Sequence, residues 1–319
     1  MADEADDKIM TQQLCGCNPE LLYWPERRFD LVNAGTIVLP QDMRDVAATI
    51  WDASVVLAQY VDSLGRASWC GKRVIELGAG TGLPGIAVAR LGASVVLTDL
   101  VDALDVTRTC IAAAGVGAKS GSSAETVEAD ADETVITDGE IASNADANVA
   151  NDSAFVSRVS SSPTIIAAGG EAYGAGSLTA LPFAWGTSLA PLRSALSGGG
   201  GESQATTPAD ATDLKEMKYV ADVILGADIV YNDQYVGQLV QSIAELLHPA
   251  TTSSEVDSCD MCPPYALISY EQRRRDMHLT FFNRLEECGF DSVRVRSPML
   301  DAAAEAANVF VYRVALRSC

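Results

Sequence analysis

The sequence predicts an α/β fold in which a mostly parallel sheet carries helices on both faces. Apolar runs typical of strands alternate along the chain with stretches of helical periodicity. A glycine-rich turn, Gly78 to Gly82, directly follows one apolar strand, and the next strand ends in Asp99. This alternation is typical of units whose helices connect neighbouring parallel strands.

The first part of the chain supplies an opening segment and two strand–helix units. The opening segment, 29–38, is prone to form a strand, and 41–64 is predicted to be a helix because apolar residues recur on one face. The apolar positions of that face are Val46, Ile50, Val55, Leu57 and Val61. The two units are strand 73–77 with helix 83–91, and strand 94–99 with helix 103–114. Pro84 is tolerated in the first helical turn, where backbone N–H groups have no partner within the helix.

Two low-complexity segments interrupt the pattern. Residues 115–176 and 197–213 are rich in small and polar residues and low in aromatic ones, a composition typical of disordered insertions. The short apolar run 177–183 lies between them and is the best candidate for a third strand. Residues 1–28 are expected to be a flexible acidic N-terminus. We therefore expect one domain over 1–319 with insertions.

The last third of the chain completes the sheet. The longest apolar run, 220–231, is predicted to be the central fourth strand. Helix 234–247, strand 265–270 and helix 274–288 follow it. The last two predicted strands, 292–296 and 309–316, can form an antiparallel hairpin at one edge, which brings the total to seven.

Charge and hydropathy limit the possible functions. The net charge is −21, with 22 basic against 43 acidic residues, which argues against nucleic acid because phosphates are neutralised by clustered Lys and Arg. A basic protein substrate fits better. No apolar run approaches the ~18 residues needed to span a bilayer, and the start of the chain is polar and acidic. We expect a soluble monomer in the cytoplasm, with the nucleus as a second compartment, and no membrane partner.

Cysteine and histidine content argues against metal and hydrolase chemistry. The eight cysteines show no regular framework, and the pairs Cys15-x-Cys17 and Cys259-x-x-Cys262 lack a supporting histidine cluster, so they are interpreted as free thiols and no metal is expected. The two histidines, His248 and His278, offer almost no material for a His-based metal site or a Ser-His-Asp triad.

The glycine turn predicts a nucleoside-cofactor site. Glycines at 78, 80 and 82 let the backbone turn sharply and approach a ligand, and Asp99 is placed to accept hydrogen bonds from ribose hydroxyls. Gly80, Gly82 and Gly85 also satisfy the dinucleotide pattern G-x-G-x-x-G. However, the strand is followed by Gly78, and counting from there puts Leu83 at the third glycine position.

This register favours S-adenosylmethionine (SAM) over a dinucleotide. Glu76 supports that choice, because a carboxylate at a strand end suits a sulfonium and an ammonium group better than a pyrophosphate. A dinucleotide site and an empty structural turn both stay open. In an open α/β sheet ligands bind at the carboxyl ends of the strands, so Asp99 and Asp228 should face the same crevice. A carboxylate ending so apolar a strand is costly to bury unless it is paired, which favours a functional role for Asp228.

Five motifs in order resemble a known family, the seven-strand, family-16 protein-lysine methyltransferases of the methyltransferase-like group. They are Trp51-Asp52-Ala53, ELGAGTGLPGI from Glu76, LTDL around Asp99, FAWG around Trp185, and GADIVY ending at Tyr231. SYEQR, at 269–273, looks most like the valosin-containing-protein lysine methyltransferase branch. The helix after the second strand reads TRTCIAAAG where family members often carry asparagines. The resemblance implies a Rossmann-like, seven-stranded class I SAM-dependent methyltransferase fold.

The resemblance also implies site residues and an activity. The residues implied to contact SAM, with Trp185 beside the adenine and Asp99 at the ribose, are Trp51, Gly78, Ala79, Gly80, Asp99, Trp185 and Ala227. Asp228 and Tyr231 form the family's D-x-x-Y element at the target lysine. The implied reaction is methyl transfer from SAM to the ε-amine of a lysine in a protein, with a chaperone-type protein or an AAA ATPase as the expected substrate.

Two further functions stay open. One is methylation of a small molecule or of another protein atom, because the cofactor half of the site is more diagnostic than the acceptor half. The other is a catalytically idle SAM-binding module that holds a partner. Glu271 and Arg273 can pair with each other or with neighbouring loops, and this structural role and a functional one both stay open. Residues 273–275 are expected to be a solvated helix face.

Overall fold

The computed structural model describes residues 13–115, 166–168, 176–196, 219–249 and 263–317. All of them belong to one compact unit, made of Met1–Ala118 and Pro163–Cys319. Most of the two predicted insertions lies outside the described residues, so their disorder and the single-domain organisation stay predictions. Of the N-terminal segment expected to be flexible, residues 13–28 carry regular structure, including the 3₁₀ helix η1 (Pro19–Tyr23).

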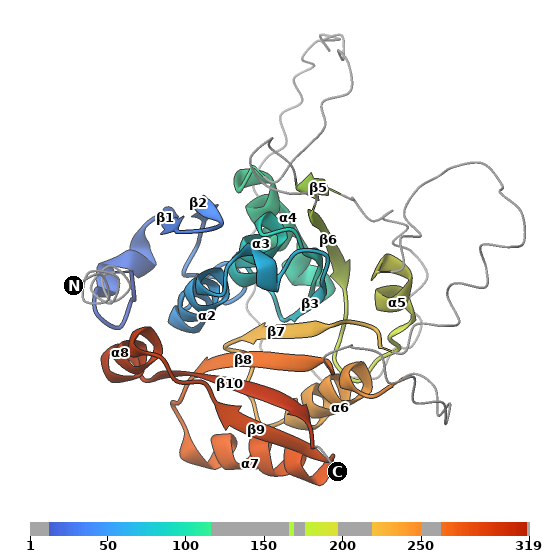
Figure 1. The fold of residues 1–319 in the computed structure, drawn as a ribbon. Coiled ribbons are helices and arrows are strands. Elements are labelled where there is room, and N and C mark those ends of the chain that lie inside the picture. The colour runs from blue at the N-terminus through green and yellow to red at the C-terminus, as the bar shows by residue number, and fades with distance from the viewer. Residues whose placement is uncertain (1–12, 116–165, 169–175, 197–218, 250–262, 318–319) are drawn as a thin grey trace, which may run out of the picture. The chain divides into compact units, whose positions relative to one another are not determined.

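The main sheet has eight strands among the described residues, in the order β5-β6-β4-β3-β7-β8-β10-β9 (Figure 1). The strands are β3 (Arg73–Leu77), β4 (Ser94–Asp99), β5 (Ile166–Ala168), β6 (Gly176–Pro182), β7 (Val223–Ala227), β8 (Tyr265–Glu271), β9 (Phe290–Arg294) and β10 (Val309–Leu316). The five strands from β6 to β8 are parallel, whereas β5, β10 and β9 are antiparallel to their neighbours. All seven predicted strands are confirmed, and β5 adds an eighth at the edge.

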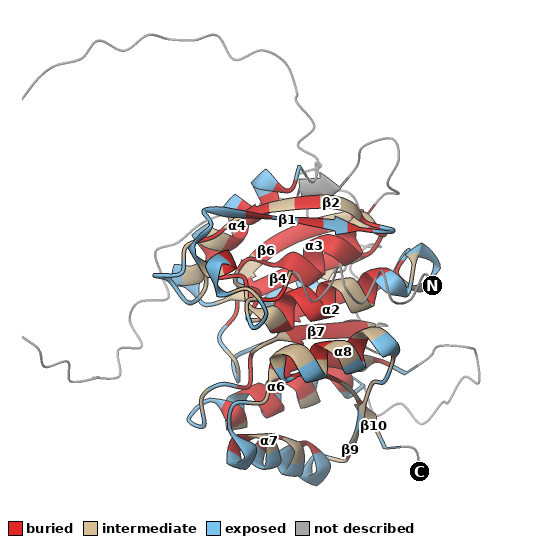
Figure 2. Ribbon diagram, turned by 90° about the vertical axis from the view of Figure 1, so that its left-hand side faces the viewer, coloured by how far each residue is buried: buried red, intermediate tan, exposed pale blue. Residues whose placement is uncertain are grey.

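Helices cover both faces of the sheet. They are α2 (Asp52–Ser63), α3 (Leu83–Arg90), α4 (Leu104–Ala113), α5 (Ala190–Leu196), α6 (Val236–Leu247), α7 (Arg275–Glu287) and α8 (Pro298–Ala307), with the short 3₁₀ helices η2 (Arg66–Ser68) and η3 (Val101–Ala103). One core cluster joins Val74 of β3 to apolar residues of α2, α3, α4 and α8. The other joins Ile75 and Leu77 of the same strand to α5, α6 and α7. Because successive strand residues point to opposite faces, β3 is buried on both, as Figure 2 shows for the central strands.

The predicted helix 41–64 is wrong in its first half, because α2 begins only at Asp52. In 41–51 the Asp42 side chain accepts from the Arg44 N–H at 3.0 Å, and the Asp45 side chain accepts from the Ala47 N–H at 2.9 Å. Such local bonds give the backbone an alternative to the helix. Val46, predicted on the apolar face, is 69% exposed.

Three further elements differ from prediction. The opening segment is a separate antiparallel hairpin of β1 (Glu26–Leu31) and β2 (Gly35–Pro40). The fourth strand is shorter than predicted and ends at Ala227, because the backbone turns at Asp228, whose φ is 55°. The two last strands do pair, but α8 connects them. Its start is readable in the sequence: Pro298 occupies the first turn, and the Ser297 side chain accepts from the Leu300 N–H.

None of the helices in the described ranges is long and apolar enough to cross a membrane. The five cysteines within those ranges are free thiols, whereas Cys259, Cys262 and Cys319 lie outside them.

Candidate cofactor and acceptor site

The glycine turn after β3 has the backbone that only glycine adopts easily. Gly78, Gly80 and Gly82 have φ values of 61°, 50° and 71°. A Cβ on Gly78 would lie 2.8 Å from Ile229 Cγ2 and 3.4 Å from Trp185 Cζ2. A Cβ on Gly80 would lie 2.8 Å from the Ala47 carbonyl oxygen. Neighbouring chain therefore packs closely on the turn, and the loop 41–51 reaches it.

Asp99, at the end of β4, is bound directly to the glycine turn. Its Oδ2 accepts from the Gly80 N–H at 2.7 Å, and its Oδ1 accepts from the Leu100 N–H at 2.7 Å. Burial raises the pKa of Asp99, the two N–H donors oppose that rise, and the charge of Asp45 adds to it. A carboxylate can accept about four hydrogen bonds. Asp99 thus keeps acceptor capacity for ribose hydroxyls.

Glu76 faces the helix that follows the turn. It is 1% exposed, and its Oε2 accepts from the Gly85 N–H in α3 at 2.7 Å. Burial raises the pKa of Glu76 to about 8, which the Gly85 N–H opposes and the charge of Asp99 reinforces. Glu76 therefore holds the first turn of α3 in place behind the glycines. Its predicted role toward a sulfonium or ammonium group stays a prediction.

Trp51, Trp185, Ala79 and Ala227 surround the same end of the sheet. Trp185, half-buried after β6, lies beside the Gly78 position. Trp51 precedes α2, and its Nε1 donates to the Val46 oxygen at 3.0 Å. The Ala79 N–H donates to the Thr98 oxygen at 2.9 Å, and Ala227 ends β7 next to Asp228. The structure thus places all the predicted cofactor residues around the carboxyl ends of β3, β4, β6 and β7.

Asp228 lies at the neighbouring strand end in a left-handed turn. Its N–H donates to the Ser269 oxygen at 2.7 Å, and its Oδ1 accepts from the Glu271 N–H at 3.3 Å. Aspartate is one of the few residue types that adopts this backbone readily. Tyr231 is 51% exposed, and burial together with the charge of Asp99 and the nearby Tyr235 raises its pKa.

Sequence reasoning missed one residue at this site. Arg273 was predicted to be part of a solvated helix face, but it precedes α7 and its Nη2 lies 2.8 Å from Asp228 Oδ2. Its Cζ also lies over the Trp51 ring, 5.4 Å from the centroid. The predicted pairing of Glu271 with Arg273 is present at 2.8 Å. The sequence position of Arg273 could have indicated this. SYEQR and GADIVY lie at the carboxyl ends of β8 and β7, which are parallel neighbours in the sheet.

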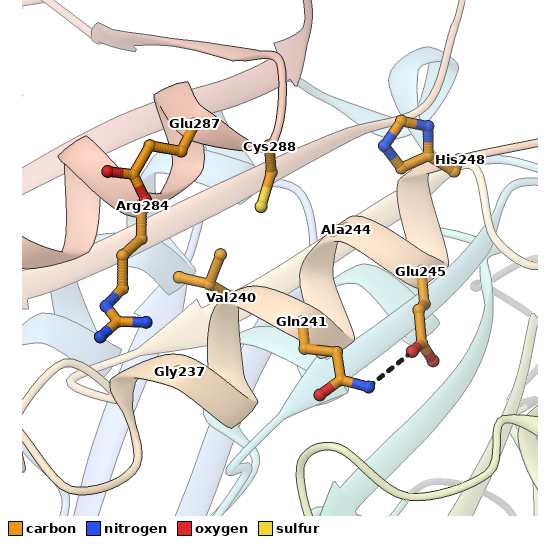
Figure 3. A pocket seen from close by; sticks show the side chains of 9 residues that line it. All are labelled: Gly237, Val240, Gln241, Ala244, Glu245, His248, Arg284, Glu287 and Cys288. Carbon is orange, nitrogen blue, oxygen red and sulfur yellow. Dashed lines mark hydrogen bonds between the residues drawn. The ribbon is translucent and has the colours of Figure 1, made fainter.

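A surface groove of about 350 Å³ lies elsewhere, between α6 and α7 (Figure 3). Val240, Arg284, Glu287 and Cys288 line it, and the Gln241 amide donates to Glu245 at 2.8 Å. It shares no residue with the predicted cofactor or acceptor set. The strand ends remain the candidate site.

The strand order and the glycine turn bound to Asp99 define a class I SAM-dependent methyltransferase fold. Residues 33–154 match the model of a family described as lysine methyltransferase, which confirms the predicted resemblance. The cofactor of this fold class is SAM, as predicted. The site fits it: the turn has no room for a Cβ, Asp99 can accept further hydrogen bonds, and an aromatic ring lies beside Gly78.

Several relatives share the central motifs. The chain is 49% identical over 86 residues to the protein N-lysine methyltransferase METTL21A of Danio rerio, covering 26% of this chain and 38% of the relative. It is 52% identical over 59 residues to the EEF1A lysine methyltransferase 3 of Xenopus tropicalis, covering 18% and 26%. It is 50% identical over 50 residues to the human histone-arginine methyltransferase METTL23, covering 16% and 26%. The matches span only about a quarter to two fifths of these relatives.

Solved structures with a similar chain path include a TehB-like SAM-dependent methyltransferase from Corynebacterium glutamicum. Its TM-score is 0.40 at 12% identity, with 82% of this chain and 88% of that chain covered. A putative SAM-dependent methyltransferase from Streptococcus mutans gives a TM-score of 0.40 at 11% identity, covering 90% and 55%.

Proposed function

We propose that this protein is a SAM-dependent protein-lysine N-methyltransferase. The observation that carries the proposal is the position of Asp228, an almost buried carboxylate at the end of β7, the strand beside β3 and its glycine turn. A carboxylate beside a nucleoside-binding site can accept a hydrogen bond from an amine and so orient it. The similarity of 33–154 to lysine methyltransferases supports the same reaction.

The cofactor supplies an electrophilic methyl group on a sulfonium. Gly78, Gly80 and Asp99 would hold its nucleoside, and Trp185 would lie beside its adenine. Asp228 would accept a hydrogen bond from the acceptor nitrogen and so orient the lone pair of that nitrogen for attack. Alignment of this kind supplies much of the rate enhancement of a displacement reaction.

The attacking amine has to be neutral. A free lysine has a pKa of about 10.4, and a poorly solvated position beside a positive sulfonium lowers it. The lysine then loses a proton to solvent before transfer. Tyr231, three residues after Asp228 and 51% exposed, would form a wall of the lysine-binding position and offer its ring face to the ammonium group before deprotonation.

The acceptor is proposed to be a lysine in a protein with a basic surface, which the net charge of −21 favours. The expected class of substrate is a chaperone-type protein or an AAA ATPase. That assignment rests on the resemblance to the valosin-containing-protein branch. The names of the three similar relatives mention neither a chaperone nor an AAA ATPase. A cytoplasmic monomer is the proposed working form, with the nucleus as a second location.

A second candidate is methylation of a different protein atom, the guanidine nitrogen of arginine. Two observations favour it. The guanidinium of Arg273 already fits against Asp228, and one relative is described as a histone-arginine methyltransferase.

The first experiment is transfer of an isotopically labelled methyl group from SAM into a lysate of the source cells, with peptide mass spectrometry and the Asp228→Ala variant alongside. Label on a lysine of one protein, absent with the variant, supports the proposal. Label on an arginine supports the second candidate, and label only in metabolites indicates a small-molecule methyltransferase. SAM binding without any label identifies an idle binding module.

A further inference from the structure

Two carboxylates and an aromatic ring converge on the guanidinium of Arg273. Its Nη2 lies 2.8 Å from Asp228 Oδ2 and 2.8 Å from Glu271 Oε2. Its Nε donates to the same Glu271 oxygen at 2.9 Å, and its Cζ lies 5.4 Å from the centroid of the Trp51 ring. Carboxylates and an aromatic face together are the groups that recognise a cationic side chain.

The exposures of the two partners differ. The side chain of Asp228 is 7% exposed, whereas that of Arg273 is 43% exposed. The guanidinium therefore covers the carboxylate and can itself be reached from solvent. Arg273 lies in the short connection between β8 and α7, outside both elements.

Asp228 does not depend on Arg273 for its position. Its backbone N–H is bound to Ser269, and its other carboxylate oxygen accepts from the Glu271 N–H. The first bond fixes the backbone of Asp228 and the second holds one carboxylate oxygen, and neither involves the guanidinium.

Replacing one cation by another suits this arrangement. A half-exposed ion pair contributes little net free energy, because solvent screens it and both side chains lose freedom. A nearly buried carboxylate left with no cation is costly. The favourable exchange therefore swaps Arg273 directly for an incoming cationic group.

We propose that Arg273 is an internal occupant of the acceptor site, which holds Asp228 and Glu271 until the cationic side chain of the substrate displaces it. This inference rests on the proposed role of Asp228 at the acceptor. It makes Arg273 a specificity-determining residue, because the enzyme accepts only side chains that compete with a guanidinium for the two carboxylates.

The test measures binding of n-butylamine and n-butylguanidinium to the full chain by calorimetry, without turnover. We expect Arg273→Ala and Arg273→Gln to bind both probes at least ten-fold more tightly than the unaltered protein. Arg274→Ala is the matched control, because Arg274 pairs instead with Asp233 at 2.9 Å and Asp276 at 2.5 Å, and it should bind like the unaltered protein. Adding Asp228→Asn to Arg273→Ala should remove the gain.

Equal binding by the unaltered protein and both Arg273 variants, or weaker binding by the variants, overturns the proposal. Thermal unfolding of each variant checks that the fold is intact, and the Gln side chain keeps a hydrogen-bond donor near Asp228. Once a substrate is identified, its KM should fall at least five-fold in Arg273→Ala. A gain in probe binding without any methyl transfer would refute the proposed function and leave Arg273 as the occupant of a cation site.

Discussion

The N–H of Gly80 and the carboxylate of Asp99 are joined by a hydrogen bond of 2.7 Å. Gly80 follows β3 and Asp99 ends β4, and these neighbouring parallel strands run in register from Arg73 with Ser94 to Leu77 with Thr98. The backbone turn and the proposed ribose-binding carboxylate thus form one unit. Any change that displaces Gly80 should also displace Asp99.

Gly80→Ala should weaken SAM binding by at least ten-fold. The new Cβ would lie 2.8 Å from the Ala47 oxygen, so either the turn or the 41–51 loop has to move. Gly289→Ala is the control, since Gly289 also has a positive φ, +85°, but has open space around it. Both changes place a Cβ on a backbone with positive φ, which L residues adopt only at a cost. Calorimetric titration with SAM separates the clash from that shared cost. Equal SAM affinities in the two variants would contradict the predicted effect of the clash.

Asp228→Asn should lower kcat by about 10²-fold, because misplacing the acceptor nitrogen by as little as an ångström costs that much. Asparagine tolerates the φ of 55° at this position, so the turn should persist. SAM affinity should stay within about two-fold, because Asp228 is assigned to the acceptor half. Asp222→Asn is the control: Asp222 pairs with Arg73 at 2.8 Å, at the opposite end of the strands. Steady-state kinetics of the two variants should diverge, and unchanged turnover in Asp228→Asn would remove its assigned role.

Trp185→Ala and Trp69→Phe should separate binding from stability. Trp185 is half-buried beside Gly78, so its loss should weaken SAM binding several-fold with little change in Tm. Trp69 is fully buried, and its Nε1 donates to the Val61 oxygen at 2.7 Å. Removing that donor should lower the free energy of unfolding by about 1–3 kcal/mol. Fluorescence titration and thermal unfolding of both variants test the distinction, which fails if Trp185→Ala binds SAM normally.

Glu76→Gln should reduce the dependence of stability on pH. The pKa of Glu76 is raised from 4.5 to about 8, chiefly by burial. The folded state therefore keeps a proton that the unfolded state loses, and stability falls as pH rises between these two values. The slope from one such group is ~1.4 kcal/mol per pH unit. Glutamine carries no titrating proton and can still accept from Gly85.

Denaturant unfolding of both proteins at several pH values from 5 to 8.5 checks this expectation. The exposed Glu287 provides the control in Glu287→Gln, which should leave the profile unchanged. Asp99 also has a raised pKa, so some decline should persist in Glu76→Gln. Parallel profiles for the unaltered protein and Glu76→Gln would show that Glu76 does not titrate as described.

Most of the sheet was predictable from the sequence, because buried parallel strands are continuous apolar runs. β3 and β4 begin and end where predicted. The errors fall where short polar side chains compete with the backbone pattern. Asp42 and Asp45 form turns inside an apparent helix, and Asp228 ends a run that stays apolar beyond it. The Ser297-Pro298 start of α8 was present and was overlooked.

The sequence by itself determined the α/β class and the strands that lead to the glycine turn, to Asp99 and to Asp228. It also determined that both acids lie at the carboxyl ends of the parallel strands. Local periodicity and backbone preference carry that information. Only the tertiary structure decided what each side chain touches. It bound Glu76 to α3, brought the 41–51 loop against Gly80 and placed Arg273 on Asp228. These contacts join residues up to 45 positions apart, so they depend on packing between elements that a local pattern does not encode.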